Sequence, residues 1–418
     1  MKILHVCSNY HPAFGGPQYT MKYLSENLVK FYHDEVQVAT TNSLYGPEMK
    51  MFHEIKPATE IINDVQVYRY PFNRWQYPMI EFSGRVYKKV IKQTLPHSLN
   101  KYRWELACNG IKNAMKKSPA DVIMATTATY MFSDYPLWRK QTKEPKPFIL
   151  YGALHLHINW PYYAPVMKRA RACDCYIANS EFEKNKLIEY GVEKKRIVSI
   201  GTGIDPQTFA CTTDEVNNFR EMYHILPDDV LIGHIGRLSE GKGVGVLLDS
   251  FQMLYQKNKQ CKLLLAGTST PYANELKQKI SDENLPVIFL EDFDNMLKPI
   301  LFNALDIFVL ASAGESFGVV FLEAWACKKP VIGAETGAVS NILSAGNDSL
   351  LFNPGDKLSL YKKLEVLTTN YELQRKLGEN GFKKIMDKYS WPVITKKYRD
   401  AYMLGIEYFK ADSALLKR

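Results

Sequence analysis

The stretch Gly314-Glu315-Ser316-Phe317-Gly318-Val319-Val320-Phe321-Leu322-Glu323-Ala324 decides how this chain of 418 residues is interpreted. The apolar run before it, Ile307–Leu310, predicts a fully buried strand, and the helix formers that follow predict a helix over residues 319–327. Glu315 is therefore expected in a strand-to-helix turn, where unpartnered helix amides favour the acceptor oxygens of a phosphate or a sugar. Glu323 lies about five residues into that helix, roughly 7–8 Å further along its axis. Two carboxylates at this spacing could hold two hydroxyl-bearing rings of one elongated ligand.

Composition indicates an ordinary globular protein. Hydrophobic residues make up 46% and charged residues 23% of the chain, whose length suggests two or three domains. No apolar run approaches the ~20 residues that a membrane helix needs. The N-terminus runs directly into a strand without a signal-peptide pattern, so we expect a cytoplasmic protein. Seven scattered cysteines, an odd number, predict reduced structural thiols.

Short apolar strands alternate with helical segments along the whole chain. In the first half the predicted strands cover residues 3–7, 36–39, 65–70, 122–124, 148–151, 176–178 and 197–200; in the second half they cover 231–235, 263–266, 287–290, 307–310 and 331–332. This alternation predicts parallel sheets covered by helices, and hence two Rossmann-like domains of the α/β class. We place them at 1–205 and 206–388, followed by a closing C-terminal segment, 389–418. In such sheets, ligands bind beyond the carboxyl ends of the strands.

Two glycines follow the first strand. Gly15 and Gly16 precede a helical pattern that starts near Thr20, and they would let the backbone approach a ligand closely. The alternative is a flexible connector. The chain contains no G-x-G-x-x-G motif, which argues against a nicotinamide enzyme.

A socket of phosphate size is predicted at the start of the second half. Residues 232–243 combine a strand with a turn of small residues, and a helix starts at about Val244. The guanidinium of Arg237 offers a planar set of hydrogen-bond donors, and the ammonium of Lys242 offers a localised positive charge. The alternative is a pair of surface cations near a turn.

Basic and aromatic residues interleave over residues 72–118. The chain carries a formal net charge of +9, and between residues 65 and 120 its only acids are Glu81 and Glu105, against 11 basic residues. This pattern suits an anionic membrane surface, with the rings at the interface. The alternative is a solvated helix face. A nucleic-acid partner is not expected because no recognition module is visible.

These motifs together resemble the retaining glycosyltransferases of family 4, and the resemblance covers nearly the whole chain. It implies the GT-B fold, in which two Rossmann-like domains face each other across a cleft and a C-terminal helix crosses back to the first domain. It also implies transfer of a hexose-type sugar from a UDP- or GDP-linked donor to an acceptor hydroxyl, with retention at the anomeric carbon. No metal or other cofactor is implied, because fixed positive charge and helix amides would stabilise the leaving diphosphate.

The resemblance assigns roles to individual residues. The implied catalytic residues are Glu315, His155, Arg237 and Lys242, with His157 as the rival of His155 in the loop after residues 148–151. The implied donor-binding residues are Gly15, Gly16, Arg237, Lys242, Glu291, Phe293, Glu315, Ser316, Phe317, Gly318, Val319 and Glu323. Glu315 would hold hydroxyls of the sugar and Glu323 the ribose. The base and sugar of the donor, and the acceptor, are left open.

Three alternatives remain at this point. Asp292-Phe293-Asp294 spells the D-x-D that binds a metal in the GT-A fold, but the double Rossmann pattern argues against that fold. A nucleotide-sugar epimerase of similar fold would act without an acceptor. A non-catalytic scaffold would be expected to lose its charged socket, which is present here. The basic first domain makes a polysaccharide or lipid-linked glycan pathway, at the inner face of a membrane, an expectation.

Overall fold

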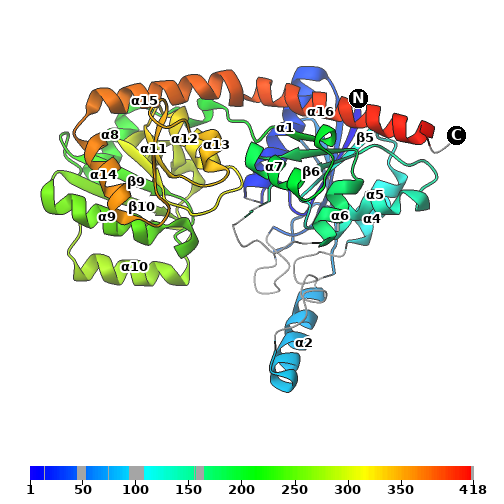
Figure 1. The fold of residues 1–418 in the computed structure, drawn as a ribbon, viewed down its shortest axis with the longest axis horizontal. Helices are drawn as coiled ribbons and strands as arrows, with labels where there is room; N and C mark the ends of the chain where they lie inside the picture. The colour runs from blue at the N-terminus through cyan, green and yellow to red at the C-terminus, as the bar shows by residue number, and fades with distance from the viewer. Residues whose placement is uncertain are drawn as a thin grey trace. The chain divides into compact units, whose positions relative to one another are not determined.

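The computed structural model describes residues 1–13, 15–44, 53–73, 75–93, 108–154, 156 and 164–415 (Figure 1). Two compact units are distinguished. Unit 1 comprises Met1–Leu154, Asn159–Gly201 and Ile394–Arg418, and the main part of unit 2 is Thr202–Val393. The sequence pattern placed the corresponding boundaries after residues 205 and 388.

Unit 1 is built on an eight-stranded sheet in the order β3-β4-β2-β1-β5-β6-β7-β8. Its neighbouring strands are parallel except for β3, which runs antiparallel to β4. The strands are β1 (Lys2–Cys7), β2 (Glu35–Thr41), β3 (Thr59–Ile62), β4 (Val65–Tyr70), β5 (Val122–Thr126), β6 (Phe148–Tyr151), β7 (Cys175–Ala178) and β8 (Ile197–Ser199). The central strands β5, β6 and β7 are buried throughout, as expected for a parallel sheet covered on both faces.

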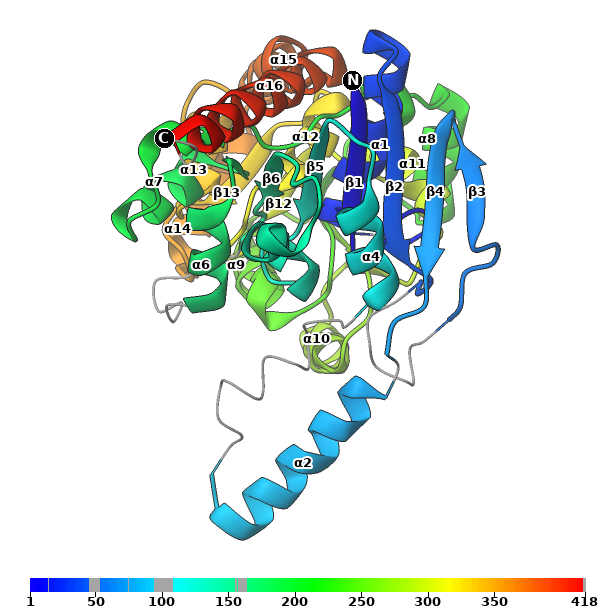
Figure 2. The same ribbon diagram turned by 90° about the vertical axis from the view of Figure 1, so that its right-hand side faces the viewer.

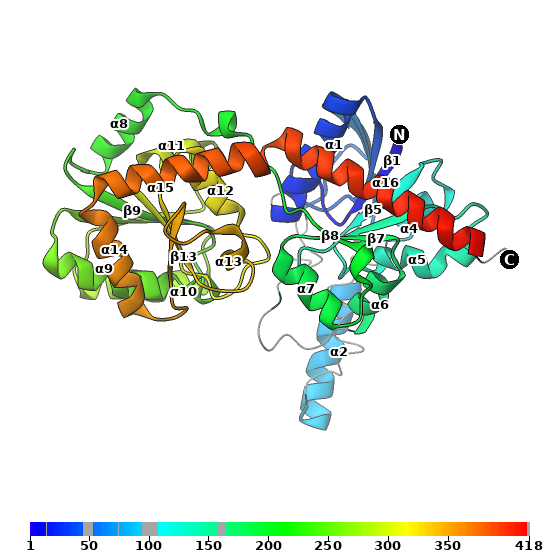
Figure 3. The same cartoon turned by 45° about the horizontal axis from the view of Figure 1, so that its top comes forward.

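Helices other than α2 (Gln76–Ile91), which extends away from the sheet, pack around it (Figures 2 and 3). The helices of unit 1 are α1 (Gly16–Tyr32), α2 (Gln76–Ile91), α4 (Asn109–Lys117), α5 (Tyr135–Trp138), α6 (Ala164–Ala172) and α7 (Glu181–Glu189), together with most of α16 (Trp391–Leu415). Tyr402 on α16 reaches the buried His5 of β1, with 2.9 Å between its hydroxyl and Nε2. Tyr398 donates to the carbonyl of Gly201 at 2.8 Å. The end of the chain is thus part of the core of unit 1.

Unit 2 is built on a fully parallel six-stranded sheet in the order β11-β10-β9-β12-β13-β14. Its strands are β9 (Val230–Ile235), β10 (Cys261–Gly267), β11 (Val287–Glu291), β12 (Ile307–Leu310), β13 (Val331–Ala334) and β14 (Ser349–Phe352). Its helices are α8 (Thr213–Met222), α9 (Val244–Lys257), α10 (Pro271–Asp282), α11 (Lys298–Ala304), α12 (Val319–Ala326), α13 (Val339–Ile342), α14 (Lys357–Thr368) and α15 (Tyr371–Lys384). Two apolar clusters, one around Phe302, Phe321 and Trp325 and one around Leu248, Phe251 and Leu364, hold these helices to the sheet.

The predicted strands are all present, but one helix start needs correction and two further strands were not predicted. α1 begins at Gly16 and not near Thr20, because Gly15 takes the N-cap position and Pro17 stands in the first turn, where its missing N–H costs nothing. β3 and β14 were not predicted. All seven cysteines are free, as expected. No helix in the described part of the chain is both long and apolar enough to span a membrane.

Candidate active site

The charged residues predicted in the second half of the chain lie near the carboxyl ends of the unit 2 strands. In the sheet, β9 lies between β10 and β12. The connection after β9 leads to β10 on one side and the connection after β12 leads to β13 on the other, so the strand order reverses between β9 and β12. Such a switch point is where open parallel sheets bind ligands. Arg237 lies two residues beyond β9, and Glu315 lies in the loop between β12 and α12.

Glu315 forms an ion pair with Lys242, with 2.7 Å between Oε1 and Nζ. The Glu315 side chain is only 7% exposed and that of Lys242 29%. Gly243 brings their loops together: it has φ of 69°, and a Cβ there would lie 2.1 Å from the carbonyl oxygen of Ala311. The Ser312 hydroxyl also donates to the carbonyl of Gly241 at 3.2 Å. The packing of the two loops therefore places the acid beside the cation.

A second ion pair joins Glu323 to Lys298. Gly318, with φ of 92°, is the N-cap of α12, and Glu323 lies on the buried side of this helix. Both carboxylate oxygens accept from Lys298 Nζ, at 2.6 and 2.7 Å. Lys298, the first residue of α11, was not predicted as a site residue.

A pocket of about 230 Å³ lies at the carboxyl ends of β9, β10 and β11. It is lined by Ile235, Gly236, Arg237, Gly267, Thr268, Asp292, Phe293, Asn295, Lys298 and Val320. Of its two cations, Arg237 comes from the loop after β9 and Lys298 from the start of α11, and Phe293 offers an aromatic surface beside them. The arrangement suits an anion joined to a flat ring.

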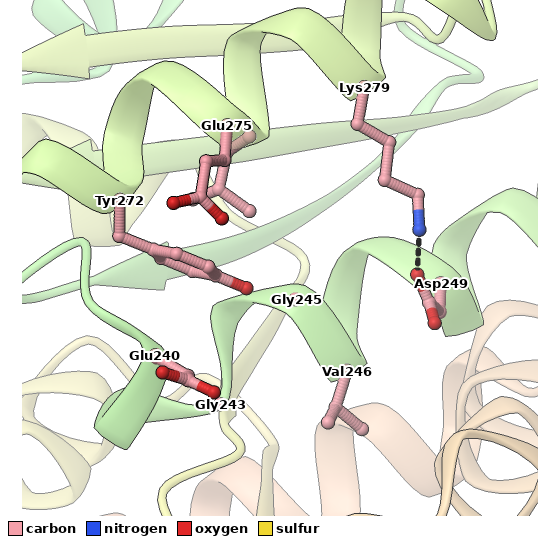
Figure 4. A pocket seen from close by; sticks show the side chains of 9 residues that line it. Glu240, Gly243, Gly245, Val246, Asp249, Tyr272, Glu275 and Lys279 are labelled. Atoms are coloured by element: carbon pink, nitrogen blue, oxygen red, sulfur yellow. Dashed lines mark hydrogen bonds and ion pairs between the residues drawn. The ribbon is translucent and has the colours of Figure 1, made fainter.

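A larger pocket of about 510 Å³ lies between α9 and α10 but has the opposite charge (Figure 4). Glu240, Asp249 and Glu275 line it, and its lysine, Lys279, is paired with Asp249. Burial, followed by the charges of these acids, raises the pKa of Tyr272 there. Such a surface repels phosphates, so the smaller pocket is the better candidate for a nucleotide.

The acids at the end of β11 and in the loop after it stabilise local structure. Glu291 accepts from the Ser269 hydroxyl at 2.5 Å and pairs with Lys277, which, with Ser269, lowers its pKa. Asp292 accepts from the Ser269 amide at 3.0 Å, and Asp294 caps the next turn by accepting from the Met296 amide at 2.9 Å. Both carboxylates of the D-x-D therefore accept hydrogen bonds from backbone amides. The described residues include no cluster of three metal-binding side chains.

Unit 1 has a small polar pocket at its own switch point. β1 lies between β2 and β5, and beyond the carboxyl ends of β1 and β5 lies a cavity of about 50 Å³. Its described lining has no charged side chain and consists of Cys7, Ser8, Asn9, Pro17, Gln18, Thr126, Thr127 and Tyr130. Gly15 and Gly16 lie next to it at the start of α1.

The remaining predicted residues have different surroundings. Phe317 is buried, and its ring lies 5.7 Å from that of Tyr389, so it belongs to the core of unit 2. Ser316, in the turn before α12, and Val319, the first residue of that helix, are half-buried. His155 and His157 lie outside the described residues, as do Arg74, Lys101, Arg103 and Trp104 of the basic stretch.

Both halves of the chain match models of known glycosyltransferase families. The family model for glycosyltransferase family 4 matches residues 14–208, and that for glycosyl transferases group 1 matches residues 216–384. The capsular polysaccharide biosynthesis glycosyltransferase CapM of Staphylococcus aureus is 29% identical over 240 residues, which cover 54% of this chain and 60% of CapM. The match thus spans less than two thirds of that relative's length.

Solved structures resemble the whole chain in fold. The Anabaena Alr3699/HepE structure in complex with UDP and glucose aligns with a TM-score of 0.71 at 18% identity, covering 96% of this chain and 98% of that one. Sucrose-phosphate synthase from Thermosynechococcus elongatus aligns with a TM-score of 0.73 at 17% identity, covering 98% and 100%. The predictions of family and fold are thereby confirmed: the chain belongs to the glycosyltransferases of family 4, with a group 1 glycosyl transferase match in its second half, and has the GT-B fold of two Rossmann-like domains.

Proposed function

We propose that this protein is a retaining glycosyltransferase that moves a hexose-type sugar from a UDP- or GDP-linked donor to an acceptor hydroxyl without a metal. The observation that carries the proposal is a group of charges beyond the carboxyl ends of the unit 2 strands in a family 4 chain. The group consists of the ion pairs Lys242–Glu315 and Lys298–Glu323 and of Arg237, which lines the same pocket as Lys298. Three cations and two carboxylates there match the diphosphate and the two hydroxyl-bearing rings of a nucleotide sugar.

The nucleoside would occupy the pocket beside Phe293, with its ribose hydroxyls at Glu323. Lys298 holds both oxygens of Glu323 and lines the same pocket, so it fixes the carboxylate where a ribose would meet it. The Anabaena neighbour was solved with UDP and glucose, which makes UDP-glucose the first donor to test.

Catalysis would rest on charge that develops as the bond between the anomeric carbon and the phosphate oxygen breaks. Arg237, Lys242 and the amides of residues 316–318 would stabilise the departing diphosphate, the kind of preorganised electrostatics that contributes most to many enzymes. A donor phosphate oxygen would take the proton of the acceptor hydroxyl on the same face of the sugar. Glu315 would accept hydrogen bonds from the sugar hydroxyls and orient the ring. Its ion pair with Lys242 connects the sugar site to the phosphate site.

Acceptor binding is assigned to unit 1. The polar pocket beyond β1 and β5 offers neutral hydrogen-bonding groups of the kind that bind sugar hydroxyls. Among the described residues, nothing lies within 4 Å of a Cβ added to Gly16, so packing does not require a glycine there, whereas a ligand close to the backbone would. CapM is a glycosyltransferase of capsular polysaccharide biosynthesis, which supports a polysaccharide pathway for this chain. A lipid-linked glycan pathway at the cytoplasmic face of a membrane is the alternative.

The test is product analysis with a panel of UDP- and GDP-linked sugars, with and without acceptors. We expect a glycosidic product with retained anomeric configuration and undiminished turnover in EDTA. Glu315→Gln should lower kcat by about 100-fold or more while nucleotide binding persists, because the lost charge acts on the sugar. Glu372→Gln, an exposed acid on α15, is the matched control.

Other outcomes separate the alternatives. Conversion of donor alone into an isomeric nucleotide sugar would identify an epimerase. Tight nucleotide binding without turnover of any donor would identify a scaffold. An absolute requirement for Mn²⁺ would contradict metal-independent transfer.

A further inference from the structure

α2 exposes an apolar row that no described part of the chain covers. Trp75, Met79, Phe82, Val86 and Val90 are 64, 63, 68, 46 and 69% exposed. Their spacing of four, three, four and four residues keeps them within about 80° of one another on a helix of 3.6 residues per turn. None of the described side chains of α2 is buried. Figure 2 shows α2 outside the layers of helices that cover the sheet of unit 1.

Scattered exposed apolar residues need no explanation, but a continuous row does. Elsewhere in the described chain, large exposed apolar side chains such as Ile61, Met222 and Met296 stand on separate elements. On α2 they form one stripe about four turns long. Burying this stripe would remove considerable apolar surface from water, so its exposure indicates an interaction partner.

Cations flank one side of the stripe. Arg85, Lys88, Lys89 and Lys92 are all exposed, and by helical position they lie together beside the apolar row. The described helix carries one acid, Glu81. A second copy of α2 would bring like charges together, whereas an anionic surface would meet charges of opposite sign. The charge pattern therefore favours an anionic partner over self-association.

We infer that α2 docks onto an anionic lipid bilayer, lying in the plane of the interface with Met79, Phe82 and Val86 inserted among the acyl chains. A helix with one apolar face and adjacent lysines is the form that interfacial helices take. Trp75, at the N-terminal end, would lie at the headgroup level, where indole rings accumulate. The lysines would contact lipid phosphates. The inference does not depend on glycosyl transfer, since docking requires neither donor nor acceptor.

The experiment is vesicle flotation of the full-length chain with two lipid compositions, phosphatidylcholine alone and phosphatidylcholine with 30% phosphatidylglycerol. We expect binding to the anionic vesicles and reversal by high salt. Met79→Ser combined with Phe82→Ser should weaken binding by about tenfold or more. Lys88→Gln combined with Lys89→Gln should weaken it by roughly fivefold for each charge. All four positions are exposed, so folding is not at risk.

Matched controls alter the same chemistry elsewhere. Met222→Ser with Leu226→Ser removes two exposed apolar side chains of unit 2, and Lys140→Gln with Lys143→Gln removes two exposed charges of unit 1. Both controls should bind as the parent does. Trp75 gives a local readout: vesicles should shift its fluorescence to the blue, and Trp75→Phe should abolish that shift.

Three results would overturn the inference. Equal binding to neutral and anionic vesicles would show that anionic lipid is not required for docking. Unchanged binding by the serine double variant would place docking elsewhere. Concentration-dependent dimerisation that the serine variant abolishes, without vesicle binding, would identify α2 as a contact between copies.

Discussion

Two lysines of unit 2 each bond a glutamate, yet their positions predict different kinetic roles. Lys242 reaches Glu315 from the loop after β9, next to where a diphosphate would leave. Lys298 holds Glu323 at the pocket proposed for the nucleoside. An interaction that strengthens only in the transition state affects kcat, whereas one made equally in the bound ground state affects KM.

Lys242→Gln should therefore lower kcat by about 10²–10³-fold with little change in KM for the donor. Lys298→Gln should raise KM for the donor by about tenfold or more and change kcat little, because hydrogen bonds to a charged group contribute about 1.5–3 kcal/mol. Steady-state kinetics with the donor varied separates the two effects. Lys376→Gln, an exposed lysine of α15, should behave as the parent enzyme. If Lys242→Gln instead raised KM alone and Lys298→Gln lowered kcat alone, Lys242 would not lie beside the diphosphate and Lys298 would not lie beside the nucleoside.

Sequence alone predicted the members of this site that belong to motifs and missed the others. Glu315, Glu323, Arg237 and Lys242 lie within recognisable strings. Lys298 precedes Glu323 by 25 residues on a different helix, and only the folded sheet brings their side chains together. Phe317 is in the motif but faces the core, because the turn before α12 points its ring at Tyr389. The roles of all these residues, those of His155 and Glu291 included, remain predictions.

Two buried groups of unit 1 should give opposite pH dependences of stability. Burial lowers the pKa of His5 from 6.5 to about 3, so between pH 3 and 6.5 the unfolded chain binds more protons there and stability rises with pH. Burial raises the pKa of Glu183 from 4.5 to about 7, so between pH 4.5 and 7 the folded chain binds more protons there and stability falls with pH. Each slope is about 1.4 kcal/mol per pH unit. Between pH 4.5 and 6.5 the two contributions should nearly cancel.

Single substitutions should reveal each slope by itself. Relative to the parent, Glu183→Gln should make the free energy of unfolding rise with pH between 4.5 and 6.5, and His5→Gln should make it fall. Urea denaturation at half-unit pH steps measures both differences. Parallel pH curves for the parent and either variant would show that the substituted group does not titrate as proposed.

At the scale of elements, the contact between two loops sets the geometry of the active site. Gly243 is in the left-handed region, and the space for a side chain is taken by the Ala311 carbonyl. Gly241, two residues earlier in the same loop, would place a Cβ in open space and is not in the left-handed region. The two glycines therefore form a matched pair for testing the loop.

Gly243→Ala should destabilise the protein by about 2 kcal/mol or more, from the left-handed conformation and the collision with Ala311. Gly241→Ala should change stability by less than about 1 kcal/mol. Denaturant unfolding measures both, and donor turnover should fall with Gly243→Ala because Lys242 is displaced from Glu315. Equal stabilities of the two variants would mean that the loops are not held as described.

Elements were predictable where burial imposes a continuous apolar run. The central strands β5, β6 and β12 are buried along their whole length, so their sequences stand out. β3 is an antiparallel edge strand with no buried residue, and Thr59-Glu60-Ile61-Ile62 therefore carries little signal. β14 is short, and its start is hidden because its first residue, Ser349, continues the polar run of Asn347 and Asp348. Edge strands are weakly specified because only one side of each is paired.

At the scale of the molecule, the chain completes unit 1 only at its far end. His5 and Tyr402 are 397 positions apart and share a hydrogen bond, and Arg399 pairs with Asp34. No local pattern predicts such a contact, because hydrophobic periodicity reports which face of a helix is buried and not which sheet covers it. The residues proposed to hold the diphosphate and the nucleoside, in contrast, all belong to unit 2. Ligand binding should therefore act on one unit first.

Hydrogen exchange can test this asymmetry. With UDP or GDP at 100 times its Kd, amides of unit 2 that exchange through unfolding of the unit should slow by about 100-fold, a stabilisation of about 2.7 kcal/mol. β9, β10 and β11 should show the effect, because the pocket lies at their carboxyl ends. β1 and β5 of unit 1 should be unaffected by nucleotide alone, because the residues assigned to the diphosphate and nucleoside belong to unit 2. Lys298→Gln, whose binding is weakened, should lose the protection at the same nucleotide concentration and recover it at a higher one. Protection centred on β1 and β5 would move the nucleotide to unit 1 and contradict the site.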